Sequence, residues 1–90
     1  MARWHIVFSG RVQHVGFRTT ALCLARGLSL TGWVDNRPDG TVEMEAQGGA
    51  GQLRGLVMRL KRQPHHRIAR VDIREIDILP DERKFRIGRG

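Results

Sequence analysis

The chain has 90 residues, which is enough for one compact domain and leaves no room for a second hydrophobic core. Hydrophobic residues make up 40% and charged residues 28% of the sequence, as in a globular protein that folds in water. Neither a transmembrane run nor a signal-peptide pattern is present, so we expect a cytoplasmic protein without a membrane partner. The net charge of +7 favours an anionic ligand, either a phosphorylated small molecule or a nucleic acid, and a solvated basic surface is the alternative.

The first predicted elements are a strand and a helix. Over residues 3–9 the sequence alternates around Trp4, Ile6 and Phe8, as in a central strand of a sheet. Apolar residues then recur at helical spacing and predict a helix of about three turns over residues 18–28. The members of this apolar stripe are Phe17, Ala21, Leu24, Ala25 and Leu28.

A loop with two glycines joins this strand to the helix. Its residues are Gly10, Arg11, Val12, Gln13, His14, Val15, Gly16 and Phe17, followed by Arg18. Such a loop can turn several backbone N–H groups inward, and it ends at a helix N-terminus, so it predicts a cradle for an anion. Arg18 adds a planar, permanently charged guanidinium group that suits a phosphate. The alternative is a turn that only reverses the chain.

A hairpin and a second helix follow. Residues 32–36 predict a short strand, and Pro38-Asp39-Gly40 supplies the turn that reverses the chain. The next strand is half buried, because its apolar residues Val42, Met44 and Ala46 alternate with the polar residues Thr41, Glu43 and Glu45. After a loop over residues 48–51, an amphipathic helix ends near Arg62. Its apolar positions are Leu53, Leu56, Val57 and Leu60.

The last part of the chain predicts two more strands. A change of strand parity predicts a bulge or break near Arg74 and Glu75, and residues 85–87 predict a short edge strand. The parity change is carried by Val71, Ile73, Ile76 and Ile78. The order strand, helix, strand, strand, helix, strand predicts an α+β, ferredoxin-like βαββαβ sandwich over residues 1–90, an antiparallel sheet with two helices on one face.

This topology predicts that two distant parts of the chain meet. The first two strands run parallel with the third between them, because a right-handed helical crossover joins them. Their C-terminal ends, which carry the loop at residues 10–18 and Asn36, should therefore lie at one edge of the sheet. Asn36 then has two interpretations: a side chain that caps the turn, or a neutral amide that positions a water molecule near a phosphate.

Four blocks of the sequence resemble the acylphosphatase family. They are Gly10-Arg11-Val12-Gln13, Val15-Gly16-Phe17-Arg18, Leu30-Thr31-Gly32-Trp33-Val34-Asp35-Asn36 and Pro38-Asp39-Gly40-Thr41-Val42-Glu43. Looser matches at Gly48, Ala69, Val71 and Phe85 extend the resemblance over essentially the whole chain. The resemblance implies hydrolysis of the carboxyl–phosphate bond of acyl phosphates, without a metal ion or an organic cofactor.

The resemblance also implies roles for individual residues. Arg18 matches the arginine that binds the phosphoryl group, and Asn36 matches the asparagine that orients the attacking water. The loop from Gly10 to Phe17 matches the cradle whose amides hold the phosphate oxygens, so inorganic phosphate or sulfate is expected to fit it as well. The expected partner is a small-molecule acyl phosphate, with no nucleic acid, and a monomer is expected from the lack of an obvious exposed apolar strand.

Two positions depart from the family pattern. His14 stands where the family loop usually has glycine, which costs about 1 kcal/mol if the backbone there needs a positive φ. Its side chain is expected either on the solvated rim or in contact with the substrate. Ser29 stands where the family usually ends the first helix with glycine, and Gly27 is expected to compensate in part.

The remaining cysteine and histidine residues predict no further chemistry. Cys23 has no partner for an internal disulfide and is predicted to be a packing residue, not a nucleophile. His5 is expected on a sheet surface, and His65 and His66 on the solvated surface of a loop. No Cys/His spacing resembles a zinc site, so we expect no metal.

Two other functions fit parts of the sequence. The common RNA-recognition domain shares the predicted order of strands and helices, but it needs stacking aromatic residues where this chain has Glu43 and Glu45. A catalytically silent domain that binds an anion or a protein is the second alternative. The presence of both Arg18 and Asn36 argues against it, and His14 keeps it open.

Overall fold

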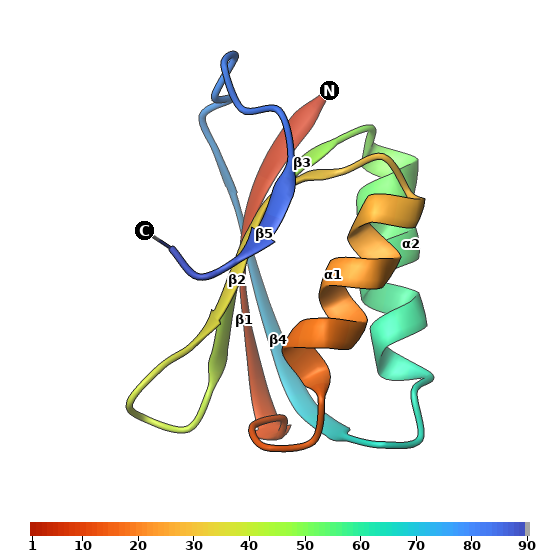
Figure 1. Cartoon of the computed structure of the whole chain (residues 1–90), viewed down its shortest axis with the longest axis vertical. Helices are drawn as coiled ribbons and strands as arrows, with labels where there is room; N and C mark the ends of the chain where they lie inside the picture. The colour runs from red at the N-terminus through yellow and green to blue at the C-terminus, as the bar shows by residue number, and fades with distance from the viewer. Residues whose placement is uncertain (90) are drawn as a thin grey trace.

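The computed structural model describes residues 1–89 as two helices packed on one face of a five-stranded sheet (Figure 1). The elements are β1 (Ala2–Arg11), α1 (Phe17–Gly27), β2 (Thr31–Asn36), β3 (Val42–Gly48), α2 (Ala50–Lys61), β4 (Arg67–Ile76) and β5 (Phe85–Ile87). This order, with both helices on one side, confirms the predicted ferredoxin-like α+β fold.

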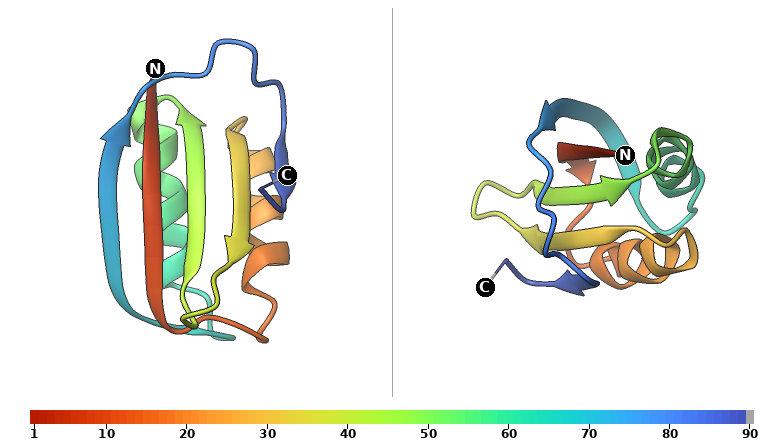
Figure 2. Two further views of the ribbon diagram at one scale, coloured as in Figure 1. Left: turned by 90° about the vertical axis from the view of Figure 1, so that its left-hand side faces the viewer. Right: turned by 90° about the horizontal axis from the view of Figure 1, so that it is seen from above.

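The strands lie in the order β4-β1-β3-β2-β5, as the left-hand view of Figure 2 shows. The pairs β4–β1, β1–β3 and β3–β2 are antiparallel, and β5 pairs in parallel with β2. The sheet is therefore mixed, not wholly antiparallel as expected. The connection over residues 77–84 crosses the end of the sheet and brings β5 to the edge opposite β4 (Figure 2).

The core lies between the sheet and the two helices. Ile6 of β1 pairs with Met44 of β3, which pairs with Val34 of β2, and all three side chains are fully buried. The stripes predicted for the helices supply the other side of the core. Their buried members are Phe17, Ala21 and Ala25 from α1 and Leu53, Leu56, Val57 and Leu60 from α2.

The predicted bulge near Arg74 and Glu75 is wrong. Strand β4 pairs with β1 in an unbroken register from Arg70 to Ile76, and the register shifts instead between Ser9 and Gly10. Because β4 is an edge strand, Ile73 stays about half exposed although it pairs with the buried Ile6. The alternation of apolar residues along this part of the sequence therefore did not predict which side chains of β4 are buried.

Helix α1 ends in a Schellman motif. The N–H of Leu30 donates to the carbonyl of Ala25 at 2.9 Å, and the N–H of Ser29 donates to that of Arg26 at 3.1 Å. Ser29 is the left-handed residue of this motif, with φ 59°. Gly27 is still helical, so it does not compensate for the serine as expected.

Replacing the residues at these two positions one at a time should stabilise the protein. Ser29→Gly removes the left-handed strain and should raise the free energy of unfolding by about 1 kcal/mol. Gly27→Ala places a methyl group in open space within a helix and should add about 0.5–1 kcal/mol. Urea unfolding of the two variants measures both effects. A destabilised Ser29→Gly variant would contradict the assignment of strain to this cap.

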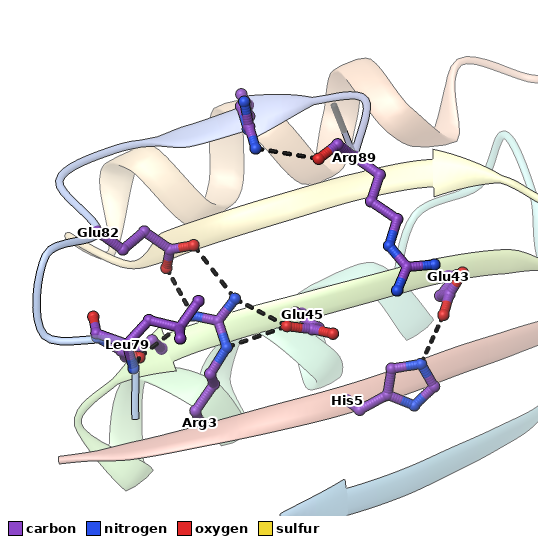
Figure 3. Close-up of polar contacts among 9 residues, drawn as sticks. Arg3, His5, Glu43, Glu45, Leu79, Glu82 and Arg89 are labelled. Atoms are coloured by element: carbon purple, nitrogen blue, oxygen red, sulfur yellow. Dashed lines mark hydrogen bonds and ion pairs between the residues drawn. The ribbon is translucent and has the colours of Figure 1, made fainter. Parts of the chain in front are cut away.

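A buried arginine fastens the connection before β5 to the outer face of the sheet (Figure 3). The side chain of Arg3 is 1% exposed, and its guanidinium lies 2.8 Å from Glu45 and 2.7 Å from Glu82. It also donates to Gln47 at 3.1 Å, and Gln47 in turn donates to the carbonyl of Leu79 at 3.0 Å. Burial by itself lowers the pKa of Arg3, but the hydrogen bonds that Arg3 donates to Glu82 and Glu45, together with their negative charges, outweigh it, and its pKa is raised.

Removing this arginine should be costly, because two carboxylates are left close together without a counter-charge. Arg3→Ala is expected to lower the free energy of unfolding by about 3 kcal/mol. Arg54→Ala, on the exposed face of α2, is the matched control and should change it by less than about 0.5 kcal/mol. Urea unfolding at pH 7 measures both variants, and equal stabilities would show that the cluster contributes nothing.

Candidate active site

The loop between β1 and α1 is fixed at both ends by buried side chains. Val12 and Phe17 are each 1% exposed, so both ends of the segment between them are anchored in the core. The ring of Phe17 packs against Phe8 at 5.0 Å between centroids and against His66 at 4.6 Å. The backbone from residue 13 to residue 16 therefore has little freedom to move relative to the sheet.

The backbone of this loop adopts the left-handed conformation at two residues, His14 (φ 62°) and Gly16 (φ 79°). Turns of this kind direct successive backbone N–H groups to the same side of the chain. Gly16 is also the N-cap residue of α1, and no side chain caps the first turn of this helix. The first N–H groups of α1 thus lack the side-chain partner that a capped helix provides, and an anion can bind them.

Gln13 ties the loop to the turn that follows β2. Its Nε2 atom donates to the carbonyl of Arg37 at 2.7 Å and to that of Thr41 at 2.9 Å. The same turn is closed by Asp39, whose carboxylate accepts from the hydroxyl of Thr41 at 2.6 Å. The sequence predicted Gln13 only as a member of the cradle and gave no signal for this role, because its partners are backbone carbonyls more than 20 residues away.

The amide oxygen of Asn36, the last residue of β2, is left unpaired within the described part of the chain. Oδ1 is buried and has no hydrogen-bond partner among residues 1–89. The following turn is held by Gln13 and Asp39, so the interpretation of Asn36 as its cap finds no hydrogen bond to support it. An unpaired amide oxygen of this kind can accept a hydrogen bond from a water molecule.

Arg18 extends from the first turn of α1 toward the end of β2. Its Nη1 atom lies 3.5 Å from Oδ1 of Asp35, the neighbour of Asn36 in the sequence. The side chain of Arg18 is 43% exposed, so its guanidinium group is open to a ligand from solvent. The predicted meeting of the two strand ends is therefore present: the loop, the start of α1 and the end of β2 lie at one edge of the sheet (Figures 1 and 2).

Several residues lie elsewhere than expected. Gly10 and Arg11 still belong to β1, where they pair with Ile68 and Arg67 of β4, so the loop outside the sheet begins at Val12. Cys23, predicted to be a packing residue, is exposed on α1, because the buried stripe of this helix consists of Phe17, Ala21 and Ala25.

The three histidines outside the loop differ in their surroundings. His66 is 6% exposed, not solvated as expected, because it packs on Phe17 and its Nε2 donates to the carbonyl of Leu60 at 2.6 Å. His5 lies on the outer face of the sheet, as predicted, 2.7 Å from Glu43 (Figure 3). His65 is exposed, which confirms the expectation for that residue.

Within residues 1–89, no three His, Cys, Asp or Glu side chains come together in a way that could hold a metal ion. Neither helix in this part of the chain is long and apolar enough to span a membrane.

Comparison with known proteins assigns this arrangement to a family. The model of the Acylphosphatase family matches residues 4–87. The chain belongs to the acylphosphatase family. It is 43% identical to an acylphosphatase of Chlorobaculum tepidum, over 94% of each chain, and 42% identical to one of Geobacillus thermodenitrificans, over 100% of this chain and 97% of that one. The crystal structure of the acylphosphatase from Bacillus subtilis superposes with a TM-score of 0.92 at 34% identity, covering 99% of this chain and 100% of that one.

Substitution of His14, the strained histidine of the loop, tests whether its side chain contacts the substrate. His14→Gly relieves the left-handed strain and should raise the free energy of unfolding by about 0.5–1 kcal/mol. Because the side chain of His14 is exposed on the rim, kcat and KM of this variant for benzoyl phosphate should stay within about twofold of the parent. His65→Ala is the control for the loss of an exposed histidine. A rise of about tenfold in KM for His14→Gly alone would indicate direct contact between His14 and the substrate.

Proposed function

We propose that this chain hydrolyses the carboxyl–phosphate bond of acyl phosphates, with Arg18 binding the phosphoryl group and Asn36 orienting the attacking water. The observation that carries the proposal is the convergence of three complementary groups at one edge of the sheet. They are the uncapped start of α1, a half-exposed guanidinium and an unpaired amide oxygen. The first two favour a phosphoryl group, and the third favours a neutral water beside it.

The phosphoryl group occupies the loop over residues 12–17, where backbone N–H groups of the cradle and of the first turn of α1 donate to its oxygens. Inorganic phosphate and sulfate fit the same groups. Arg18 donates from its guanidinium fork and neutralises the charge that gathers on these oxygens in the transition state. The buried Val12 and Phe17 keep the donors in place, so that little reorganisation is needed as the reaction proceeds.

The water molecule donates a hydrogen bond to Oδ1 of Asn36 and attacks phosphorus on the side opposite the acyl oxygen. The new bond joins the water oxygen to phosphorus, and the bond between phosphorus and the acyl oxygen breaks. The electron pair of that bond leaves with the carboxylate. The second proton of the water passes to a phosphoryl oxygen, so the products are a carboxylate and dihydrogen phosphate, and charge and atoms balance.

The chemistry fits a site that lacks a general base. A carboxylate is a good leaving group, so positioning and charge stabilisation can supply most of the acceleration. Asn36 is suited to this site because an amide can hold the water without repelling the phosphoryl dianion, whereas a carboxylate in its place would repel it. The proposal therefore requires no metal ion and no organic cofactor.

We also propose that residues 1–90 act as one domain and as a monomer in the cytoplasm, on a small-molecule acyl phosphate and not on a nucleic acid. Large exposed apolar residues support the monomer, because those of the described chain are spread over several elements. They include Met58 of α2, Ile73 of β4 and Ile87 of β5. A single, exposed cysteine suits a reducing compartment.

Hydrolysis of benzoyl phosphate in the presence of a chelator tests the proposal. Arg18→Ala and Asn36→Ala should each lower kcat/KM by about 100-fold or more, because each removes a group that acts in the transition state. Arg18→Lys should be intermediate, since it keeps the charge and loses the fork. Arg54→Ala, which lies on the exposed face of α2, should retain the parent rate. Full activity in both alanine variants, with native circular dichroism, would falsify the assignment of the site.

A further inference from the structure

One carboxylate lies beside the proposed phosphoryl-binding group and has no part in the mechanism above. Asp35 is the penultimate residue of β2, and its Oδ1 atom lies 3.5 Å from Nη1 of Arg18. The same oxygen accepts a hydrogen bond from the backbone N–H of Asn36 at 2.9 Å. Both site residues are therefore in contact with a single negatively charged group.

The surroundings of Asp35 favour an ion pair between its carboxylate and Arg18. In the sheet register Asp35 lies directly opposite Glu43 of β3, a pairing of like charges that is unfavourable across two strands. Glu43 has its own partner, since it lies 2.7 Å from His5 (Figure 3). The cation next to Asp35 is Arg18, whose side chain approaches from the start of α1.

The contact between Asp35 and Arg18 is electrostatic and loose. Its 3.5 Å separation is longer than a charge-assisted hydrogen bond, which measures about 2.8 Å. The two side chains are 40% and 43% exposed, so solvent screens the pair and Arg18 can leave it. An ion pair that held Arg18 rigidly would have a shorter separation between its charged groups and would be more buried.

We propose that Asp35 competes with phosphoryl groups for Arg18 and so weakens the affinity of the site for both the substrate and the inorganic phosphate product. This inference rests on the proposed role of Arg18. A phosphoryl group held by the guanidinium fork lies on the order of 7 Å from the Asp35 carboxylate, close enough for the two anions to repel each other. Binding of a phosphoryl group therefore either breaks the ion pair between Asp35 and Arg18 or proceeds against this repulsion. Either effect lowers the affinity of the site for the phosphoryl group. A lower affinity for inorganic phosphate also means weaker inhibition by this product.

A substitution that removes the negative charge of Asp35 but keeps the shape of its side chain tests this competition. Asp35→Asn keeps an oxygen that can accept the N–H of Asn36, but it removes the negative charge beside Arg18. The dissociation constant of inorganic phosphate and the KM for benzoyl phosphate should each fall about threefold to tenfold at low ionic strength. The value of kcat should change by less than about twofold, because the transition-state contacts are retained. In 0.5 M NaCl the gain should shrink to less than about twofold, because salt screens exposed charges.

Two control variants separate charge from structure. Asp35→Glu retains the carboxylate and should bind phosphate like the parent, within about twofold. Asp81→Asn makes the same change of net charge in the connection between β4 and β5, at the other end of the sheet (Figure 1), and should leave phosphate binding unchanged.

The outcomes distinguish this inference from the proposed function. If Arg18→Ala abolishes turnover while Asp35→Asn leaves KM and phosphate binding unchanged, the site stands and the competition is wrong. A fall of about tenfold in kcat for Asp35→Asn at constant KM would also overturn it, because Asp35 would then orient Arg18 for catalysis. Full activity of Arg18→Ala would overturn the proposed function, and the competition with it.

Discussion

Strands β1 and β2 run in the same direction with β3 between them, and every other feature of the site depends on that arrangement. A right-handed crossover through α1 joins the two strands, so their C-terminal ends come to the same edge of the sheet. The end of β1 leads into the loop and the start of α1, and the end of β2 carries Asn36. Two short segments separated by a whole helix thereby lie at one edge of the sheet.

The rigidity of this edge comes from the core and from one side chain. Val12 and Phe17 are buried in the same core that packs the helices against the sheet, so the loop between them moves with the fold. Gln13 then connects the loop to the turn after β2 through two backbone carbonyls. A reaction that relies on positioned donors, with no strong base, requires this kind of fixed backbone. The left-handed residue at His14 is the cost of holding the N–H groups in that geometry.

The carboxylates of the outer face and of the candidate site are arranged in a way that suits the proposed chemistry. On the outer face, carboxylates are matched with cations, since Glu45 and Glu82 contact Arg3, and Glu43 contacts His5 (Figure 3). These pairs occupy the surface where an RNA-recognition domain would present stacking aromatic residues. At the candidate site Asp35 is a carboxylate within reach of Arg18, and it can therefore tune how strongly an anion is held.

The periodicity of the sequence determined the elements, the helical faces and the ferredoxin-like order, because the alternation of apolar residues is a local property that follows from burial. The right-handed crossover also made the meeting of the loop with Asn36 predictable. The tertiary structure decided what local patterns do not encode. His66 is buried because Phe17 packs over it. Strand β4 stays in register through Arg74 and Glu75 because its edge position lets Ile73 remain exposed, and Gln13 and Asp35 acquire their partners across the fold. The sequence by itself thus determined which residues could bind a phosphoryl group, and only the packing of distant segments decided which groups hold them in place.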